Sequence, residues 1–159
     1  MTSKTLLATM ILMAGAASAA SAQTATQTVT FQVDAINQIA FTGSPSLVVN
    51  TATAGANPSA ATASANWAVT TNQTGAKITA SIGSAMPAGV TLSVNLGAPA
   101  GATSAGAQAL STTAVDLVTG ITKVAQGSLG VTYSLSATAA AGVVASTSRT
   151  VTYTVTGGV

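Results

Sequence analysis

Apolar and polar residues alternate over several segments of the chain, and this alternation predicts β-strands. Val29, Phe31 and Val33 alternate with Thr30 and Gln32, which places one apolar and one polar face on a strand. The same period of two recurs further along. The segments that show it are 67–70, 78–82, 90–96, 131–135 and 151–155. The chain is therefore expected to be rich in half-buried strands.

Turn-forming residues separate these segments, as an antiparallel β-protein requires. Clusters of Gly, Pro, Asn and Ser stand at 42–45, 72–75, 87–89 and 97–101. The cluster at 72–75 is expected to close a hairpin between the strands that contain Trp67 and Ile78.

Other segments give weaker signals. Short apolar pieces at 47–49 and 115–118 bring the expected number of strands to seven or eight. Small residues dominate 51–65 and 98–113, which are expected to be long loops because they can bury little surface. The alanine-rich stretch 137–145 can hold one helical turn.

Seven or eight short strands with turns between them favour an all-β fold, an immunoglobulin-like antiparallel β-sandwich of two sheets. Residues 23–159 are expected to form this single domain. Trp67 is the one tryptophan, and its large ring is expected at the core between the sheets. The alternative is an exposed Trp67 that stacks on a sugar.

The first 22 residues have the features of a cleavable signal peptide. Lys4 precedes an apolar run at 6–17, and Ala20-Ser21-Ala22 has the small-x-small pattern of a cleavage site. Cleavage there leaves Gln23 first, whereas a second pattern of the same kind allows cleavage after Ala19. A membrane anchor is disfavoured, since the apolar run is shorter than the roughly 20 residues of a spanning helix. The expected location is secreted, periplasmic or cell-surface, with no membrane span after cleavage.

Charge is sparse and does not indicate a nucleic-acid partner. Without Lys4, three cations (Lys77, Lys123 and Arg149) face two anions (Asp34 and Asp116), a net charge of +1. The cations are far apart in sequence, whereas a nucleic-acid surface needs clustered ones. Low net charge gives little mutual repulsion. The expected partners are copies of the chain itself or other envelope or surface proteins.

Residue types suited to catalysis are scarce, so the chain is not expected to be an enzyme or to hold a cofactor or metal. It has no His, Cys or Glu, which excludes His-based triads and the usual zinc sites. Asp34 and Asp116 are candidates for a carboxylate pair or a calcium site, but each stands alone in sequence. A Ser-Lys dyad through Lys77 or Lys123 has no motif behind it. No catalytic, cofactor-binding or metal-binding residue is assigned.

Two further patterns are interpreted as ordinary features. Alternate threonines at 24–30 and 150–156 are typical of the solvent side of a strand, and an ice-binding array would need a regular internal repeat. The N-x-T sequence at Asn72 matches a glycosylation site, and we interpret it as fortuitous.

The signal peptide, the Thr/Ala/Gly-rich β-domain and the strand at 151–155 together resemble secreted bacterial surface proteins with immunoglobulin-like domains, including fimbrial subunits. Many fimbrial subunits carry a disulfide, whereas this chain has no cysteine. The resemblance implies a non-catalytic structural or adhesion protein, such as a self-assembling filament or coat subunit. The alternative function is a module that binds carbohydrate or another surface polymer, which requires exposed aromatic side chains.

The first segment after the cleavage site, 23–33, alternates clearly and is expected to pair within its own sheet. Its alternative is addition to the exposed edge of a neighbouring copy.

Overall fold

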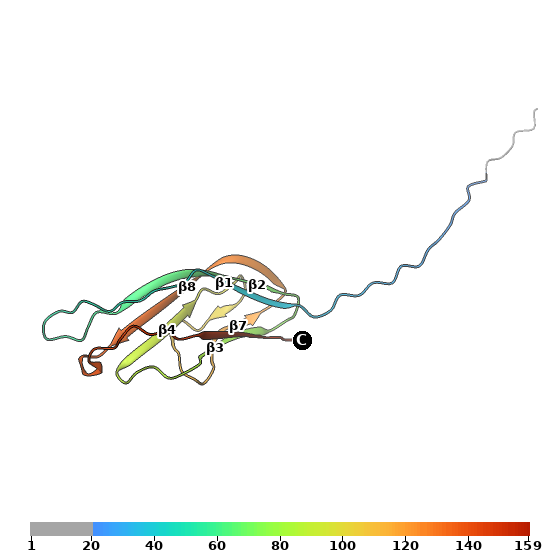
Figure 1. Ribbon diagram of the computed structural model, residues 1–159. Helices are drawn as coiled ribbons and strands as arrows, with labels where there is room; N and C mark the ends of the chain where they lie inside the picture. Colours follow the sequence, from blue (N-terminus) through green and yellow to red (C-terminus); the bar gives the residue numbers. More distant parts are fainter. Residues whose placement is uncertain (1–20) are drawn as a thin grey trace, which may run out of the picture. The chain divides into compact units, whose positions relative to one another are not determined.

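The structure is a computed structural model that describes residues 21–159 (Figure 1). The chain divides into two units, Met1–Gln32 and Val33–Val159. In the first unit, residues 21–32 have no regular secondary structure. The predicted signal peptide at 1–22 lies outside the described residues, except for its last two positions.

Residues 21–159 contain nine strands and one short 3₁₀ helix. The strands are β1 (Asn37–Thr42), β2 (Ala61–Thr71), β3 (Ala76–Ile82), β4 (Val90–Leu96), β5 (Thr103–Ser104), β6 (Gln108–Ala109), β7 (Val115–Ile121), β8 (Val124–Ala137) and β9 (Val151–Thr156). The 3₁₀ helix η1 (Ala139–Ala141) lies within the stretch where one helical turn is expected. Within these residues, no helix has the length and apolar character needed to span a bilayer.

The strands form two antiparallel sheets, which confirms the all-β prediction. One sheet has the order β1-β2-β8-β4-β6 and the other the order β5-β7-β3-β9. Figure 1 shows β1, β2 and β8 in one layer and β3 and β7 in the other. The predicted strands at 78–82, 90–96, 115–118 and 151–155 are confirmed as β3, β4, β7 and β9.

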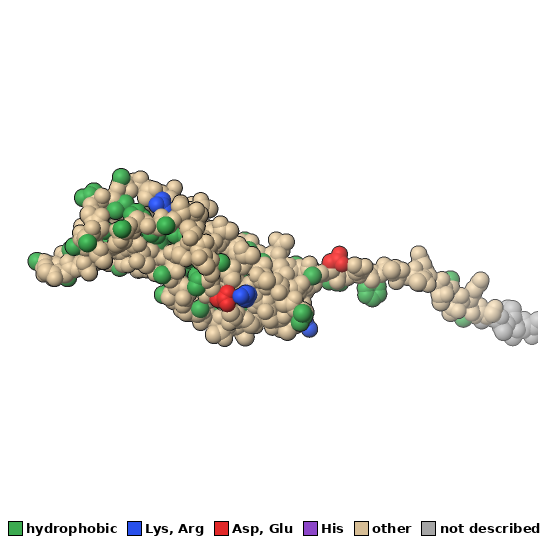
Figure 2. All heavy atoms as spheres, turned by 90° about the horizontal axis from the view of Figure 1, so that it is seen from below, with side chains coloured by type: hydrophobic (Ala, Val, Ile, Leu, Met, Phe, Trp, Pro, Cys, Tyr) green, Lys and Arg blue, Asp and Glu red, His purple; other side chains and the backbone are tan. Residues whose placement is uncertain are grey.

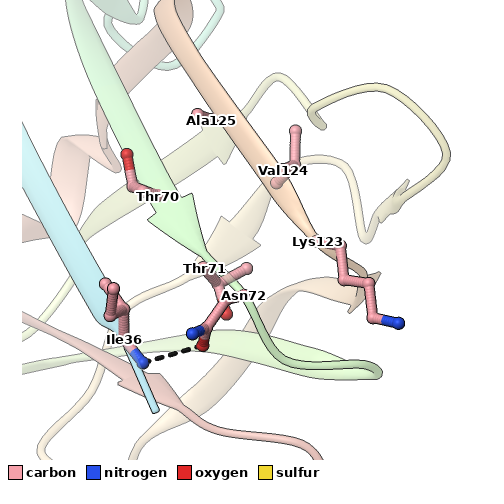
Figure 3. A pocket seen from close by; sticks show the side chains of 7 residues that line it. All are labelled: Ile36, Thr70, Thr71, Asn72, Lys123, Val124 and Ala125. Carbon is pink, nitrogen blue, oxygen red and sulfur yellow. Dashed lines mark hydrogen bonds between the residues drawn. The ribbon is translucent and has the colours of Figure 1, made fainter. Parts of the chain in front are cut away.

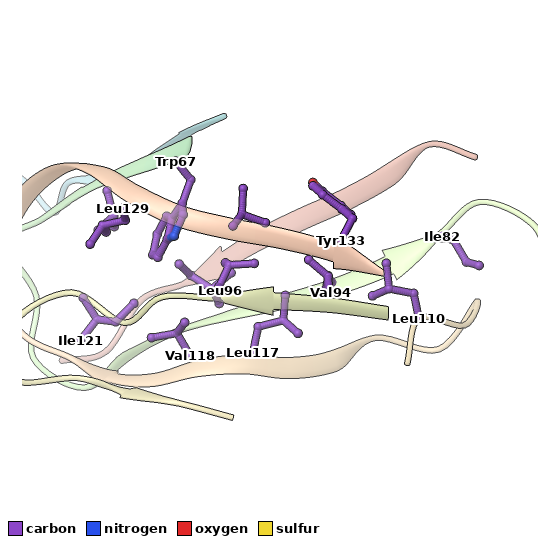
Figure 4. Close-up of a cluster of buried hydrophobic side chains, with 14 of the residues drawn as sticks. Trp67, Ile82, Val94, Leu96, Leu110, Leu117, Val118, Ile121, Leu129 and Tyr133 are labelled. Carbon is purple, nitrogen blue, oxygen red and sulfur yellow. The ribbon is translucent and has the colours of Figure 1, made fainter. Parts of the chain in front are cut away.

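One hydrophobic core lies between the two sheets. Trp67 and Leu129 contribute to it from the five-stranded sheet, and Ile78 and Leu117 from the four-stranded sheet. Trp67 is 1% exposed, so its predicted place in the core is confirmed. In Figure 4 its ring projects from one layer toward the side chains of Leu117, Val118 and Ile121.

The predicted hairpin at 72–75 is wrong. β2 pairs with β1 and β8, whereas β3 pairs with β7 and β9. The turn therefore carries the chain from one sheet to the other. Its residues indicate a reversal of direction, but the sheet that the next strand joins depends on distant partners.

Other strand predictions are also corrected. The structure has no strand at 29–33 or at 47–49, and it has one, β1, at Asn37–Thr42 that the pattern did not reveal. The expected loop 51–65 already enters β2 at Ala61, where alternate alanines are half-buried against β8. Alanine differs little from serine and threonine in hydrophobicity, so the alternation there is weak. The expected loop 98–113 contains the two-residue strands β5 and β6.

Candidate functional site

The charged side chains considered for chemistry lie at the surface without forming a cluster. Lys77 Nζ of β3 lies 3.0 Å from the Asp116 carboxylate of β7, and both side chains are about half exposed. Such pairs add little stability because water screens them. On the face shown in Figure 2, charged side chains are few and scattered. Across residues 21–159, no three His, Cys, Asp or Glu residues lie together as metal ligands would.

The other predicted candidates stand in loops. Asp34 precedes β1, and its backbone carbonyl accepts a hydrogen bond from the Asn72 side chain. Lys123 lies between β7 and β8 with a φ of 43°, and its backbone N–H donates to the Gln73 carbonyl. The structure pairs Asp116 of β7 with Lys77 of β3, and it places Asp34 in the segment before β1.

The 72–75 turn is a junction that makes hydrogen bonds with residues 34–36, with residues 122–123 and with Val159. Asn72 Oδ1 accepts a hydrogen bond from the Ile36 N–H (2.8 Å), and Asn72 Nδ2 donates to the Asp34 carbonyl (2.8 Å). The Asn72 N–H also donates to the Ile36 carbonyl (3.3 Å). Thr74 exchanges two backbone hydrogen bonds with Val159, at 2.9 and 3.1 Å. Residues 34–36 are thus held along the end of β2.

An open hollow of about 330 Å³ lies beside this junction (Figure 3). Its lining residues are Ile36, Thr70, Thr71, Asn72, Lys123, Val124 and Ala125. The Asn72 amide that faces Ile36 is already hydrogen-bonded, and the Lys123 side chain extends away from these two residues. The lining offers few free polar groups to orient a ligand, so the hollow is a weak candidate for a binding site.

The aromatic side chains gather at one side of the core. Phe41 of β1 stacks on Tyr153 of β9 with 3.9 Å between ring centroids. The Tyr153 hydroxyl lies 2.7 Å from the Tyr133 hydroxyl of β8. Burial, with the hydrogen bond to Tyr133 adding to it, raises the pKa of Tyr153 well above its ordinary value. These rings join the two sheets instead of forming an exposed platform.

The strands at this side, β1 and β9, are edge strands. In the described part of the chain, β1 pairs only with β2 and β9 only with β3. Ile39 and Phe41 of β1 and Val151, Tyr153 and Val155 of β9 pack against the core but remain partly exposed. Neither strand contains a charged residue or a proline. The opposite edges, β5 and β6, have two residues each.

Residues 23–33, here called the N-terminal arm, end in an alternation of exposed apolar residues. Val29, Phe31 and Val33 are 73%, 88% and 76% exposed. The arm contains no charged residue. The expectation that it pairs within its own sheet is wrong in this structure, because no strand forms there.

The open edges and the arm are the features that sequence reasoning located only in part. The alternation revealed β9 and the arm, but not β1 or the fact that both strands are edges. Comparisons with protein-family models, with curated proteins and with solved structures found no match to this chain.

Proposed function

We propose that this protein is a secreted or cell-surface structural subunit that assembles with copies of itself, and that it is not an enzyme. In this proposal the signal peptide at 1–22 directs export, and the two sheets form an immunoglobulin-like sandwich. In this proposal the edges of its sheets and its surface make the contacts that build a filament, a coat or an adhesive layer.

The observation that carries the proposal is the pair of open edges. A strand at the edge of a sheet presents unpaired N–H and C=O groups, and proteins that stay monomeric usually protect such edges with charges, prolines, bulges or very short strands. β5 and β6 are protected by their shortness. β1 and β9 are six residues each, uncharged and free of proline. Both also carry half-covered apolar side chains that a further strand would bury.

The sparse charge supports the same proposal. Five charged side chains occur in residues 23–159, with a net charge of +1. Copies of the domain therefore repel one another weakly at neutral pH. An assembly of such copies would depend on backbone hydrogen bonds and apolar contacts, which salt disturbs little.

The aromatic residues favour assembly over binding of a carbohydrate. Trp67 and Tyr133 are buried, and Phe41 and Tyr153 stack on each other. Only Phe31 of the five aromatic residues is strongly exposed, and it lies on the arm. A sugar-binding face normally needs aromatic rings exposed on the folded domain.

The test is the size of the exported protein in solution. The full chain is expressed in a bacterium and recovered after export, and mass spectrometry identifies its first residue, expected to be Gln23. Size-exclusion chromatography with light scattering is then expected to show species larger than one chain, growing with protein concentration. A monomer at all concentrations would contradict self-assembly. Retention of that monomer on an insoluble polysaccharide would then favour the polymer-binding function.

A further inference from the structure

The second half of the arm is similar in sequence to β9. Residues 28–33 are Thr-Val-Thr-Phe-Gln-Val, and residues 150–155 are Thr-Val-Thr-Tyr-Thr-Val. Four of the six positions are identical, and a fifth exchanges one aromatic ring for another (Phe31 and Tyr153). A sequence of this pattern already forms an edge strand in this domain. The arm therefore has the side chains that suit the layer to which β9 belongs.

The outer edge of β9 has the length and spacing to accept such a strand. Its apolar residues Val151, Tyr153 and Val155 recur at every second position, as Val29, Phe31 and Val33 do in the arm. All three β9 residues are half-buried, whereas Thr152 and Thr154 are exposed. A strand that pairs with β9 so that its apolar residues lie opposite those of β9 would place three further apolar side chains on the core side. Its threonines would then lie on the solvent side.

Pairing of the arm with β1 of its own chain would break hydrogen bonds of the domain. A hairpin of that kind needs the chain to reverse direction at 34–36, directly before β1. The Asn72 side chain binds the Asp34 carbonyl and the Ile36 N–H there, so a reversal would break these bonds. β1 also offers two inward apolar residues, Ile39 and Phe41, against three in β9.

We propose that the N-terminal arm of one copy adds to the outer edge of β9 in a second copy, with Phe31 opposite Tyr153. The two strands run antiparallel, as all paired strands of this domain do, and this pairing is slightly more stable per residue than parallel pairing. Val29 then lies beside Val155, and Val33 beside Val151. This inference rests on the proposed self-assembly and names the surfaces that carry it.

The contact joins two different surfaces, the arm of one copy and the β9 edge of the next. Such a head-to-tail contact leaves one arm and one edge free at the ends of any row of copies that has not closed on itself. It therefore produces rings if the rotation between copies closes, and open filaments if it does not.

Cysteine crosslinking tests the pairing, because the natural chain has no cysteine. In the proposed register Thr30 lies opposite Thr154. Facing residues of antiparallel strands have Cα atoms about 4.5–5.5 Å apart, within the roughly 4.4–6.8 Å that a disulfide accepts. Exported Thr30→Cys protein labelled with ¹⁵N is mixed with unlabelled Thr154→Cys protein and oxidised. Mass spectrometry is expected to find mixed dimers as the main product.

The control replaces Thr154→Cys with Ala40→Cys on the exposed face of β1. Mixed dimers with this variant and not with Thr154→Cys would overturn the β9 assignment and leave self-assembly intact. Dimers of Thr30→Cys alone would mean that arms pair with each other, which also overturns it. The absence of any dimer from a chain that light scattering shows to be monomeric would refute the proposed function as well.

A matched pair of substitutions gives an independent test. Phe31→Asp places a charge on the face that would be buried, and Thr30→Asp places the same charge on the face that would stay in water. Phe31→Asp is expected to reduce the assemblies to monomers, whereas Thr30→Asp keeps most of them. Denaturation followed by Trp67 fluorescence would show that both variants are folded, if each unfolds at the same denaturant concentration as the natural chain. Equal loss or equal retention of assembly in the two variants would contradict the proposal.

Discussion

The ring of Phe41 stacks on the ring of Tyr153, with 3.9 Å between centroids and 22° between the planes. Phe41 belongs to the edge strand of one sheet and Tyr153 to the edge strand of the other. Phe41 also lies 6.1 Å from Trp67 between centroids. The two sheets are therefore joined by aromatic contacts at the side where both β1 and β9 are open.

The hydrogen bond between Tyr133 and Tyr153 links β8 to β9 behind this stack. Tyr133→Phe and Tyr153→Phe are each expected to lower the free energy of unfolding by about 0.5–1.5 kcal/mol, the net value of one hydrogen bond. The double variant should lose little more than either single one, because all three lack the same bond. Urea denaturation measures these values. A double variant whose loss equals the sum of the two single losses would show that the hydroxyls act separately.

Because the pKa of Tyr153 is raised in the folded state, the free energy of unfolding is expected to depend on pH in the alkaline range. Tyrosine in an unfolded chain has a pKa of about 10. A higher pKa in the folded state contributes stability that is present below pH 10 and is lost as the pH rises through the folded value. Tyr153→Phe is thus expected to weaken the fall of stability above pH 10. Urea melts of both proteins between pH 8 and 12 test this, and parallel curves would contradict it.

Trp67 is the largest fully buried side chain of the core. Trp67→Ala is expected to cost on the order of 3–5 kcal/mol of stability, since it removes buried surface and leaves a cavity. Trp67→Phe should cost less. It keeps a ring, and it removes the indole N–H, which has no hydrogen-bond partner among the described residues. A loss below about 1 kcal/mol for Trp67→Ala in a denaturant melt would argue against this core.

The Asn72 side chain holds residues 34–36 in place. Asn72→Ala is expected to cost about 1–2 kcal/mol and to speed hydrogen exchange at the Ile36 amide, because it removes two hydrogen bonds to backbone groups. Thr74→Ala is the control, since it also destroys the N-x-T sequence but keeps the Asn72 side chain. Unchanged exchange at Ile36 in Asn72→Ala would show that other contacts hold the segment.

Gly158 passes directly against the 72–75 turn. A Cβ atom at this position would collide with the backbone of Thr74. Gly158→Ala should therefore displace the last residues and weaken the hydrogen bonds between Thr74 and Val159. Faster hydrogen exchange at the Thr74 amide would report this. Gly130→Ala is the control, because a Cβ there meets no atom within 4 Å. Equal exchange rates at Thr74 in the two variants would contradict the prediction.

The pattern of residues predicted the strands best where strongly apolar residues alternate with polar ones. β4 and β9 appeared in the alternation because valine, leucine and tyrosine alternate with threonine and serine. The start of β2 did not, because alanine at 61, 63 and 65 is too small to stand out from its neighbours. β8 supplies the pairing that makes this segment a strand. The arm shows the converse, since its pattern is clear but its residues form no strand.

The sequence alone determined the all-β class, the place of Trp67 in the core and the shortage of catalytic residues. These depend on the local period of hydrophobicity and on residue types, which need no knowledge of distant contacts. Only the tertiary structure decided that the 72–75 turn crosses between sheets, that Phe41 meets Tyr153, and that β1 and β9 are edges. Each of these depends on which strands pair across long separations in the chain, and a strand's own pattern does not specify its partner.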